Sequence, residues 1–425
     1  MLTISSPNRA IAAWCLYDWA NSAYVTVITT FIFAAYFTQK VAADVVGGTA
    51  QWGYAISLSG VAIAIGAPIL GAVADRTGRR KPWLALATVM ILFATAGLWF
   101  IRPDPAYALT ALVLVAVGNF CFEVGQVFYN AMLPDLAPRE RLGRVSGWGW
   151  GLGYAGGLAC LGLMLVGFIQ TDRPWFGLDP QAAEPLRASA LVVTLWFGLF
   201  ALPLFFMTPR ESERTISLGR AVAEGIDSLL RTLRNVREHG AVARYLLAHM
   251  IYADGLNTLF AFGGIYAAGS FGFDFSELIL FGIVINVTAG LGAALFGWVD
   301  DWIGPKRTIL IGLGGLILLG AALVVVEGKT LFWIIGIPLG IFCGPTQAAS
   351  RSLMAHLAPA DLRTEMFGLY ALAGKATAFV GPALLAWATM AFDSQRMGMA
   401  TILLFFIGGG LLLMAVPAPR HGREA

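Results

Sequence analysis

Long apolar stretches recur along the whole chain, and short polar turns separate them. Many of these stretches reach the roughly 20 residues that an α-helix needs to cross the hydrocarbon core of a bilayer. The pattern predicts twelve membrane-spanning helices, at residues 10–37, 51–74, 83–101, 106–133, 145–168, 188–207, 245–270, 277–298, 308–326, 331–353, 365–391 and 398–416. An even number of spans returns the C-terminus to the side of the membrane on which the chain started.

Composition supports the membrane as the solvent for most of this molecule. Of the 425 residues, 58% are hydrophobic and only 12% are charged, whereas a soluble domain carries about 25% charged residues. The four cysteines fall inside predicted spans at scattered spacings, which indicates neither a disulfide framework nor a metal site. We expect no cofactor and no nucleic-acid partner.

The basic residues are distributed unevenly between the two sides of the predicted spans. The turns that follow odd-numbered spans hold six of them: Lys40, Arg102, Arg173, Arg187, Lys329 and Arg396. The opposite side, with both termini, holds twenty. The positive-inside rule therefore predicts that both termini and the 208–244 loop are cytoplasmic. An Ala-, Gly- and Arg-rich chain with short loops favours a bacterial plasma membrane.

One sequence pattern occurs twice, which predicts two related halves. The second span ends in Gly71-Ala-Val-Ala-Asp75 and a basic run, and the eighth span ends in Gly297-Trp-Val-Asp-Asp301 and a basic pair, 226 positions later. Further echoes pair Asp18 and Asn21 with Asp254 and Asn257, and Gln126 with Gln347. Repeats in the same order indicate two halves of equal topology, related by an axis along the membrane normal.

The predicted fold class is therefore an all-α membrane protein, with twelve transmembrane helices in two pseudo-symmetric six-helix bundles. The expected domains are residues 1–207, a linker at 208–244, and residues 245–425. Within the linker, apolar residues recur at helical spacing with arginines between them: Leu218, Val222, Ile226, Leu229, Leu230 and Leu233 with Arg220, Arg231, Arg234 and Arg237. This pattern predicts an amphipathic helix that lies on the lipids of the cytoplasmic leaflet.

The loop from Gly71 to Lys81 resembles the signature of the major facilitator superfamily. Other segments narrow the resemblance: Tyr17-Asp-Trp-Ala-Asn-Ser-Ala-Tyr24, Asn130-Ala-Met-Leu-Pro134, Ser350-Arg-Ser-Leu353 and Gly381-Pro382. Together they are similar to the vacuole effluxer family, whose eukaryotic members are autophagy-related amino-acid effluxers. The resemblance covers nearly the whole chain. It implies the major facilitator fold and secondary transport, and it implies an amino-acid-like solute less directly because relatives on one fold carry different solutes.

The signature predicts a cytoplasmic gate made of Gly71, Asp75, Arg79, Asp135, Gly297 and Asp301. Gly71 lets another helix approach closely, and Asp75 suits the positive N-terminus of a neighbouring helix, which in the superfamily is the eleventh. We expect Arg79 to pair with Asp135. The second copy has Pro305 in place of Arg79, so we expect its latch to be looser.

Polar residues recur at helical spacing on spans one, four, seven and ten, which line the solute pathway in this superfamily. The candidates for binding substrate or a coupling ion, H⁺ or Na⁺, are Asp18, Asn21, Glu123, Gln126, Asp254, Asn257, Gln347, Arg351 and, on span eleven, Lys375. Each charge costs about 2.5–3.5 kcal/mol at the centre of a bilayer. We therefore expect them to face one another or a wet cavity. Some of them have the alternative role of pinning helices together by hydrogen bonds.

The leading functional hypothesis is a monomeric secondary transporter that moves a small polar or amphipathic solute by alternating access. An ATP-driven pump needs a nucleotide-binding domain, and the sequence has none. An intramembrane enzyme needs a paired nucleophile and base or a metal cluster, and the few His and Cys residues lack such spacing. A non-transporting receptor or scaffold with a transporter fold stays open as the alternative.

Overall fold

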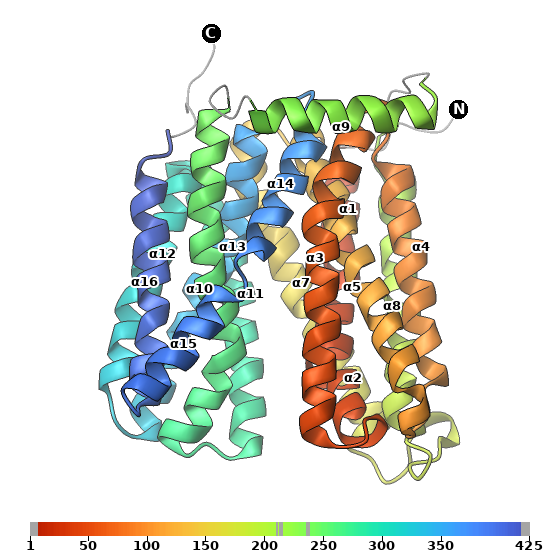
Figure 1. Cartoon of the computed structure of the whole chain (residues 1–425), viewed down its shortest axis with the longest axis vertical. Coiled ribbons are helices and arrows are strands. Elements are labelled where there is room, and N and C mark those ends of the chain that lie inside the picture. Colours follow the sequence, from red (N-terminus) through yellow and green to blue (C-terminus); the bar gives the residue numbers. More distant parts are fainter. Residues whose placement is uncertain (1–6, 210, 212–215, 235–238, 418–425) are drawn as a thin grey trace. The chain divides into compact units, whose positions relative to one another are not determined.

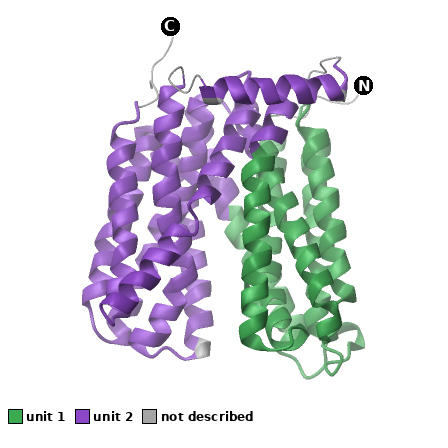
Figure 2. Cartoon of the chain, in the orientation of Figure 1, with its two compact units in different colours: residues 1–67, 78–129, 152–215 green, residues 68–77, 130–151, 216–425 purple. Residues whose placement is uncertain are grey.

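A computed structural model describes residues 7–209, 211, 216–234 and 239–417, apart from the side chains of residues 218, 233, 275 and 276. Arg237 of the predicted linker helix therefore lies outside the described residues. The described residues contain helices and no strand. They form two compact units, which Figure 2 colours separately: unit 1 has residues 1–67, 78–129 and 152–215, and unit 2 has residues 68–77, 130–151 and 216–425. The expected division at 208–244 stays a prediction.

Unit 1 is built from the helices of the first six predicted spans. They are α1 (Pro7–Ala23), continued by π-helical turns and by α2 (Phe33–Tyr36), most of α3 (Val45–Thr77), α4 (Lys81–Gly97), α5 (Ala108–Ala131), the second part of α7 (Leu142–Met164) and α8 (Glu184–Met207). Its core is aromatic near the start of α1. The rings of Trp14 and Tyr129 stack with their centroids 4.4 Å apart. The hydroxyl oxygens of Tyr17 and Thr88 lie 2.8 Å apart.

Unit 2 contains the helices of the last six predicted spans together with the linker helix. They are α9 (Leu218–Arg234), α10 (Gly240–Phe271), α11 (Phe275–Ile303), α12 (Pro305–Val325), α13 (Lys329–Leu357), α14 (Arg363–Ala376), α15 (Val380–Ala391) and α16 (Gln395–Met414). The end of α3, the short α6 (Leu133–Leu136) and the start of α7 also belong to this unit. A cluster of phenylalanines packs at the turn between α10 and α11. The ring centroids of Phe271 and Phe332 lie 4.6 Å apart.

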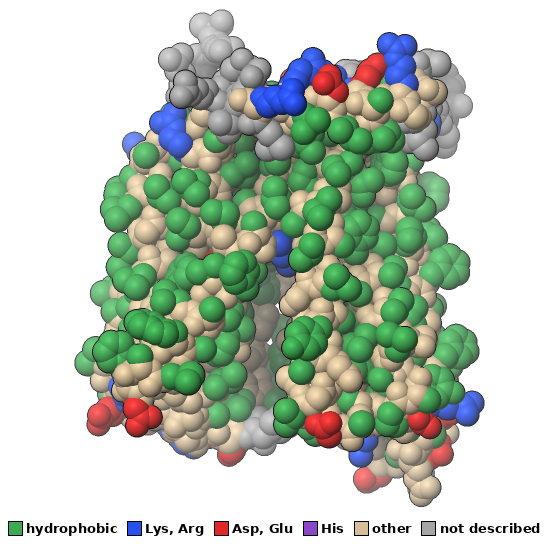
Figure 3. Space-filling view, in the orientation of Figure 1, with side chains coloured by type: hydrophobic (Ala, Val, Ile, Leu, Met, Phe, Trp, Pro, Cys, Tyr) green, Lys and Arg blue, Asp and Glu red, His purple; other side chains and the backbone are tan. Residues whose placement is uncertain are grey.

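Eleven stretches of the described residues are long and apolar enough to cross a membrane. The helix of the seventh predicted span, α10, has 32 residues but is not among the eleven. It carries His249, Asp254 and Asn257 inside its length. Figure 3 shows hydrophobic side chains along the flanks of the helices and most of the charged ones near their ends, as a bilayer requires.

The eleventh predicted span is broken, which corrects the expectation of one continuous helix over 365–391. It consists of α14 and α15, with residues 377–379 between them. Pro382 explains the break, because proline has no N–H to donate and its ring clashes with the carbonyl four residues earlier, at Ala378. Span eleven therefore contains the C-terminus of α14 and the N-terminus of α15 within its length.

The linker helix α9 lies across the ends of α3 and α14 instead of continuing a span (Figure 1). Its packed face carries Ala221, Gly225, Ser228 and Thr232, and an added Cβ on Gly225 would meet the backbone of Val73. The apolar residues Val222, Ile226 and Leu230, predicted to face the leaflet, remain about 40% exposed. The helix thus has a small and polar face toward the protein and an apolar stripe beside it. The end of unit 2 that α9 covers is called the α9 end below.

Candidate functional site

The Asp75 carboxylate, near the C-terminus of α3, binds the N-terminus of α14. Oδ1 accepts hydrogen bonds from the backbone nitrogen of Thr364 at 3.1 Å and from its hydroxyl at 2.6 Å, and Oδ2 accepts one from the backbone nitrogen of Glu365 at 2.8 Å. The first backbone N–H groups of a helix have no partner within the helix, and the helix dipole favours a negative charge there. The carboxylate satisfies both demands.

Gly71, one helical turn before Asp75, makes this contact sterically feasible. A Cβ built on Gly71 would collide with the carbonyl group of Thr364. Only a residue without a side chain lets the backbones of α3 and α14 approach this closely. Gly71 and Asp75 therefore act as a pair, one allowing the approach and the other bonding across it. This contact is called the latch below.

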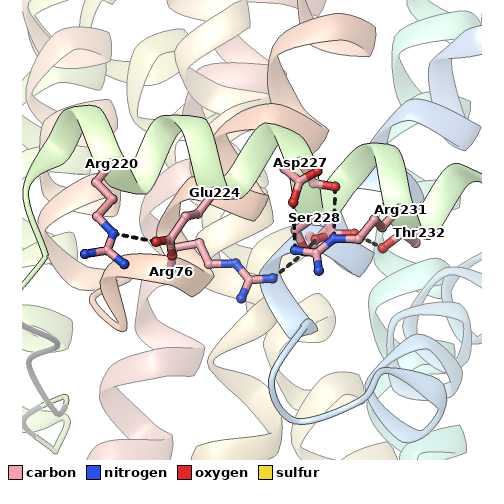
Figure 4. A network of polar contacts seen from close by, with 8 residues as sticks. Arg76, Arg220, Glu224, Asp227, Ser228, Arg231 and Thr232 are labelled. Atoms are coloured by element: carbon pink, nitrogen blue, oxygen red, sulfur yellow. Dashed lines mark hydrogen bonds and ion pairs between the residues drawn. The ribbon is translucent and has the colours of Figure 1, made fainter.

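A second carboxylate joins the latch to the linker helix. The side chain of Glu365 is fully buried, and its two oxygens accept hydrogen bonds from the hydroxyls of Ser228 at 3.0 Å and Thr232 at 2.5 Å. Arg76 donates in turn to the Ser228 hydroxyl at 2.5 Å. Figure 4 shows these contacts beneath α9, with the pairs Arg220–Glu224 and Asp227–Arg231 along the helix itself. Polar contacts thus tie α3, α9 and α14 together.

Asp135, on α6, forms an ion pair with Arg363, the first residue of α14. The superfamily signature predicted Arg79 as the partner of Asp135 and gave no role to Arg363. Arg79 belongs to unit 1 and Asp135 to unit 2, so the Arg79–Asp135 contact stays a prediction. Two acids from other helices therefore meet the first turn of α14: Asp75 at its backbone N–H groups and Asp135 at the Arg363 side chain.

The second copy of the signature binds the start of α7. Asp301 accepts hydrogen bonds from the backbone nitrogen of Arg144 at 3.1 Å and from its Nε at 3.0 Å. A Cβ on Gly297 would meet the backbone of Arg144 at 2.9 Å, as Gly71 would meet Thr364. Although Pro305 replaces the arginine of the first copy, Arg144 supplies a cation, so this second contact has an ion pair of its own.

Arg351, on α13, is almost fully buried and braces α13 against α7. Its Nε donates to the hydroxyl of Ser146 at 2.9 Å, Nη2 donates to the Ser146 carbonyl at 2.7 Å, and Nη1 donates to the Asn130 side chain at 3.3 Å. The guanidinium also lies over the ring of Trp150, 5.7 Å from its centroid. In the arrangement observed, Arg351 therefore has a strong structural role.

Asp254, on α10, lies at the break between α14 and α15. Its Oδ2 accepts a hydrogen bond from the backbone nitrogen of Gly381 at 3.1 Å, and the residue is 1% exposed. The neighbouring candidates on unit 2 differ in burial. Asn257 is exposed, whereas Gln347 and Lys375 are half-buried. Of these four residues, Asp254 alone is both charged and fully buried.

Unit 1 holds the other four candidates, in two pairs. Asp18 and Asn21 on α1 are buried, whereas Glu123 and Gln126 on α5 are half-buried. Asp18 faces α7, since a Cβ on Gly153 would lie 3.6 Å from the Cβ of Asp18. Glu123 and Gln126 are the more accessible pair.

The sequence pattern did not predict several residues of these sites: Thr364, Glu365, Ser228, Thr232, Arg144, Arg363 and Ser146. Ser228 and Thr232 share a helix face at i and i+4, but the Glu365 they contact is more than 130 residues away. Only Arg144 and Arg363 carried a usable signal, because each lies just before a predicted span on the side that is rich in basic residues.

Comparisons with known proteins identify the family. The model of the family described as vacuole effluxer Atg22 like matches residues 40–142 and 138–425. An uncharacterized MFS-type transporter of Bacillus subtilis, YxiO, is 28% identical over 95% of this chain and 94% of its own length. Autophagy-related protein 22 of Kluyveromyces lactis is 24% identical, covering 79% of this chain and 74% of its own. A gentisate transporter of Corynebacterium glutamicum is 26% identical, covering 76% of this chain and 70% of its own length.

Solved structures agree on the fold. The proton:xylose symporter XylE superposes with a TM-score of 0.73 at 15% identity, covering 97% of this chain and 96% of the symporter. The human organic anion transporter MFSD10 superposes with a TM-score of 0.74 at 15% identity, covering 96% of this chain and 99% of MFSD10. At this identity the likeness shows the major facilitator fold alone. Because the family model spans nearly the whole sequence, the chain belongs to the Atg22-like vacuole effluxer family of integral membrane transporters, which are not enzymes.

Proposed function

We propose that this protein is a secondary active transporter that moves a small, carboxylate-bearing polar solute by alternating access. The observation that carries the proposal is the latch, in which Asp75 bonds the backbone of Thr364 and Glu365 across a contact that Gly71 makes possible. A few hydrogen bonds to one helix terminus hold this contact. They are strong enough to favour one state and weak enough to be broken in each transport cycle.

The buried charges support a polar solute. Asp18, Glu123, Asp254, Arg351 and Lys375 would be costly in lipid, so they are proposed to bind the solute or the coupling ion inside the protein, together with Asn21, Gln126, Asn257 and Gln347. The cations suit a carboxylate. An amino-acid-like solute agrees with the family description of a vacuole effluxer, and an organic acid agrees with the related gentisate transporter.

We place the α9 end in the cytoplasm and the protein in a bacterial plasma membrane. The uneven distribution of basic residues supports this orientation. Membrane lipids are the proposed partners of the exposed apolar stripe on α9. The transporter is proposed to act as a monomer with H⁺ as the coupling ion, and Na⁺ is the alternative.

A thermal-shift screen of the purified protein against amino acids, gentisate and other aromatic acids, peptides and sugars tests the solute class. A ligand that binds the folded state raises its melting temperature by mass action. We expect carboxylates to stabilise the protein and sugars not to. Stabilisation by neutral sugars alone would contradict the proposed class. Binding without uptake into vesicles would favour a receptor or scaffold.

A further inference from the structure

We infer that Asp254 and the N-terminus of α15 form a proton-binding site at the break in span eleven, and that protonation of Asp254 loosens the first turn of α15. This inference deepens the proposed function and rests on it for the role of the proton as coupling ion. The carboxyl group alternates between a charged cap on a helix N-terminus and a neutral acid. Each transport cycle would use that difference to move α15.

The carboxyl group of Asp254 is only half satisfied. Oδ2 accepts the hydrogen bond from the backbone nitrogen of Gly381, whereas Oδ1 has no hydrogen-bond partner among the described residues. The side chain is 1% exposed, so water does not satisfy this oxygen from bulk solvent. An unsatisfied buried carboxylate oxygen is costly. A proton on Oδ1 would remove the charge and leave Oδ2 as an acceptor.

The local sequence builds the other half of the site. Pro382 breaks the span and creates an N-terminus for the 12-residue helix α15, whose partial positive charge favours a carboxylate. Gly381 lets this N-terminus approach α10. A Cβ at Gly381 would lie 2.9 Å from Asp254 Oδ1 and would collide with the Thr258 hydroxyl. Glycine is thus the residue that brings the backbone N–H to the carboxylate.

Two opposing influences act on the charge of Asp254. The N–H of Gly381 and the helix dipole favour the carboxylate, and burial favours the neutral acid. Gly255, the residue after Asp254, packs against Phe405 and Phe406 of α16, so the contact of α10 with α16 beside Asp254 is apolar. A group in this balance is suited to exchange a proton when the surroundings change from wet to dry, as they do between the two states of a transporter.

Few other ionisable groups face this part of α10. His249 lies on α10 itself, Lys375 on α14 and Arg351 on α13, whereas α15 has no Asp, Glu, Lys, Arg or His. On α11 the acids lie at the two ends, and α16 has Arg396 at its start. His249 is the competing proton acceptor that a test must separate, because its Nδ1 also has no partner among the described residues.

Hydrogen exchange of the full-length protein in lipid nanodiscs tests the inference without any solute. Peptides that cover residues 377–391 are followed from mildly acidic to mildly alkaline pH, and each rate is corrected for the intrinsic pH dependence of amide exchange. In the wild type, protection of the first turn of α15 should fall by about 2- to 30-fold as the pH drops, since a charge at a helix N-terminus contributes stability of that order.

Variants assign the transition. Asp254→Asn keeps an acceptor for Gly381 but does not titrate, so its exchange should not depend on pH. His249→Gln removes the competing proton acceptor on α10 and should keep the wild-type transition. A transition that survives in Asp254→Asn, or the lack of one in the wild type, would overturn the inference.

Replacing sodium chloride with choline chloride at constant pH distinguishes a bound proton from a bound sodium ion. Protection that follows Na⁺ and not pH would replace the proton by a sodium ion and overturn the assignment. Because no transport is measured, failure of an uptake assay would count against the proposed function and leave this result standing. Should Asp254→Asn not fold, the wild-type titration and the His249→Gln variant still decide, because loss of the transition in His249→Gln would assign the proton to His249 and overturn the inference.

Discussion

The Asp75 carboxylate lies 2.8 Å from the backbone nitrogen of Glu365, and the carboxylate of Glu365 in turn accepts from two hydroxyls on α9. Two acids therefore act in series. The first holds α3 to the N-terminus of α14, and the second holds α14 to the linker helix. Arg76 of α3 also donates to the Ser228 hydroxyl of α9, so the linker helix is coupled to the latch by direct contact.

Replacing Asp75 should loosen the latch. Asp75→Asn removes the charge that faces the N-terminus of α14, which contributes about 0.3–2 kcal/mol. Spin labels on cysteines at Thr77 and Asp361, on the two sides of the contact, should report a longer and broader distance distribution. Asp301→Asn, at the matching position of the second copy, is the control and should leave this distance unchanged. An Asp75→Asn distribution equal to that of the wild type would argue against the latch.

Gly71 and Gly60 offer a matched pair on one helix. Gly71→Ala should force α3 from α14, because its Cβ would collide with the Thr364 carbonyl, whereas a Cβ at Gly60 has open space around it. Alanine also favours a helix by about 1 kcal/mol over glycine. Gly60→Ala should therefore keep or raise the melting temperature, and Gly71→Ala should shift the same label distance as Asp75→Asn. Equal behaviour of the two variants would contradict the close contact.

The hydroxyls on α9 should hold that helix in place. Ser228→Ala with Thr232→Val leaves the Glu365 carboxylate without these two donors, and a hydrogen bond to a charged group contributes about 1.5–3 kcal/mol. Limited proteolysis with subtilisin should then cleave residues 216–234 faster by at least tenfold. The control is Glu224→Gln, which disturbs an exposed ion pair worth about 0.3–0.5 kcal/mol. If the double variant is cleaved at the wild-type rate, the hydrogen bonds from Ser228 and Thr232 to Glu365 do not hold α9 in place.

The orientation of the chain can be tested with single cysteines. Ser217→Cys precedes α9, and Ser394→Cys lies between α15 and α16. The distribution of basic residues predicts that an impermeant thiol reagent labels them from opposite sides of the membrane, with Ser217 cytoplasmic. Labelling of both from one side would rule out the predicted number of spans.

Glu123 is the most testable of the candidates in unit 1, because it is only half-buried. Glu123→Gln keeps hydrogen-bonding capacity but carries no proton, so we expect normal folding, retained exchange of solute and loss of uphill transport. Uptake at several pH values against Asn119→Ala, a nearby polar change on α5, separates charge from packing. Wild-type uptake by Glu123→Gln at every pH would leave Glu123 a structural polar group.

Periodicity and hydropathy predicted the all-helical fold, because lipid demands long apolar helices and so leaves a strong signal along the chain. The break in span eleven has a local signal in Gly381-Pro382 that averaging over a whole span conceals. The repeated Gly-x-x-x-Asp pattern and its resemblance to the superfamily signature also singled out Gly71 and Asp75 as a pair. These features are all encoded within a few residues of one another.

The residues that join the latch to α9 could not be predicted in the same way. Glu365 meets Ser228 and Thr232 through tertiary packing across 137 and 133 positions of sequence. The face by which α9 contacts the protein could not be predicted for a related reason. Small and hydroxyl residues pack against α3 and α14 where the backbones come close, although leucines and isoleucines dominate any hydrophobic pattern.

Uptake into proteoliposomes tests the central claim most directly. The solute that stabilises the purified protein most is supplied outside vesicles that contain the wild type, Asp75→Asn or no protein, with and without an imposed proton gradient. Secondary transport predicts that the wild type accumulates the solute above its outside concentration only while the gradient lasts, and that Asp75→Asn accumulates less. If the wild type binds the solute but vesicles with and without protein fill equally, the protein is a receptor or scaffold and the transport account is wrong.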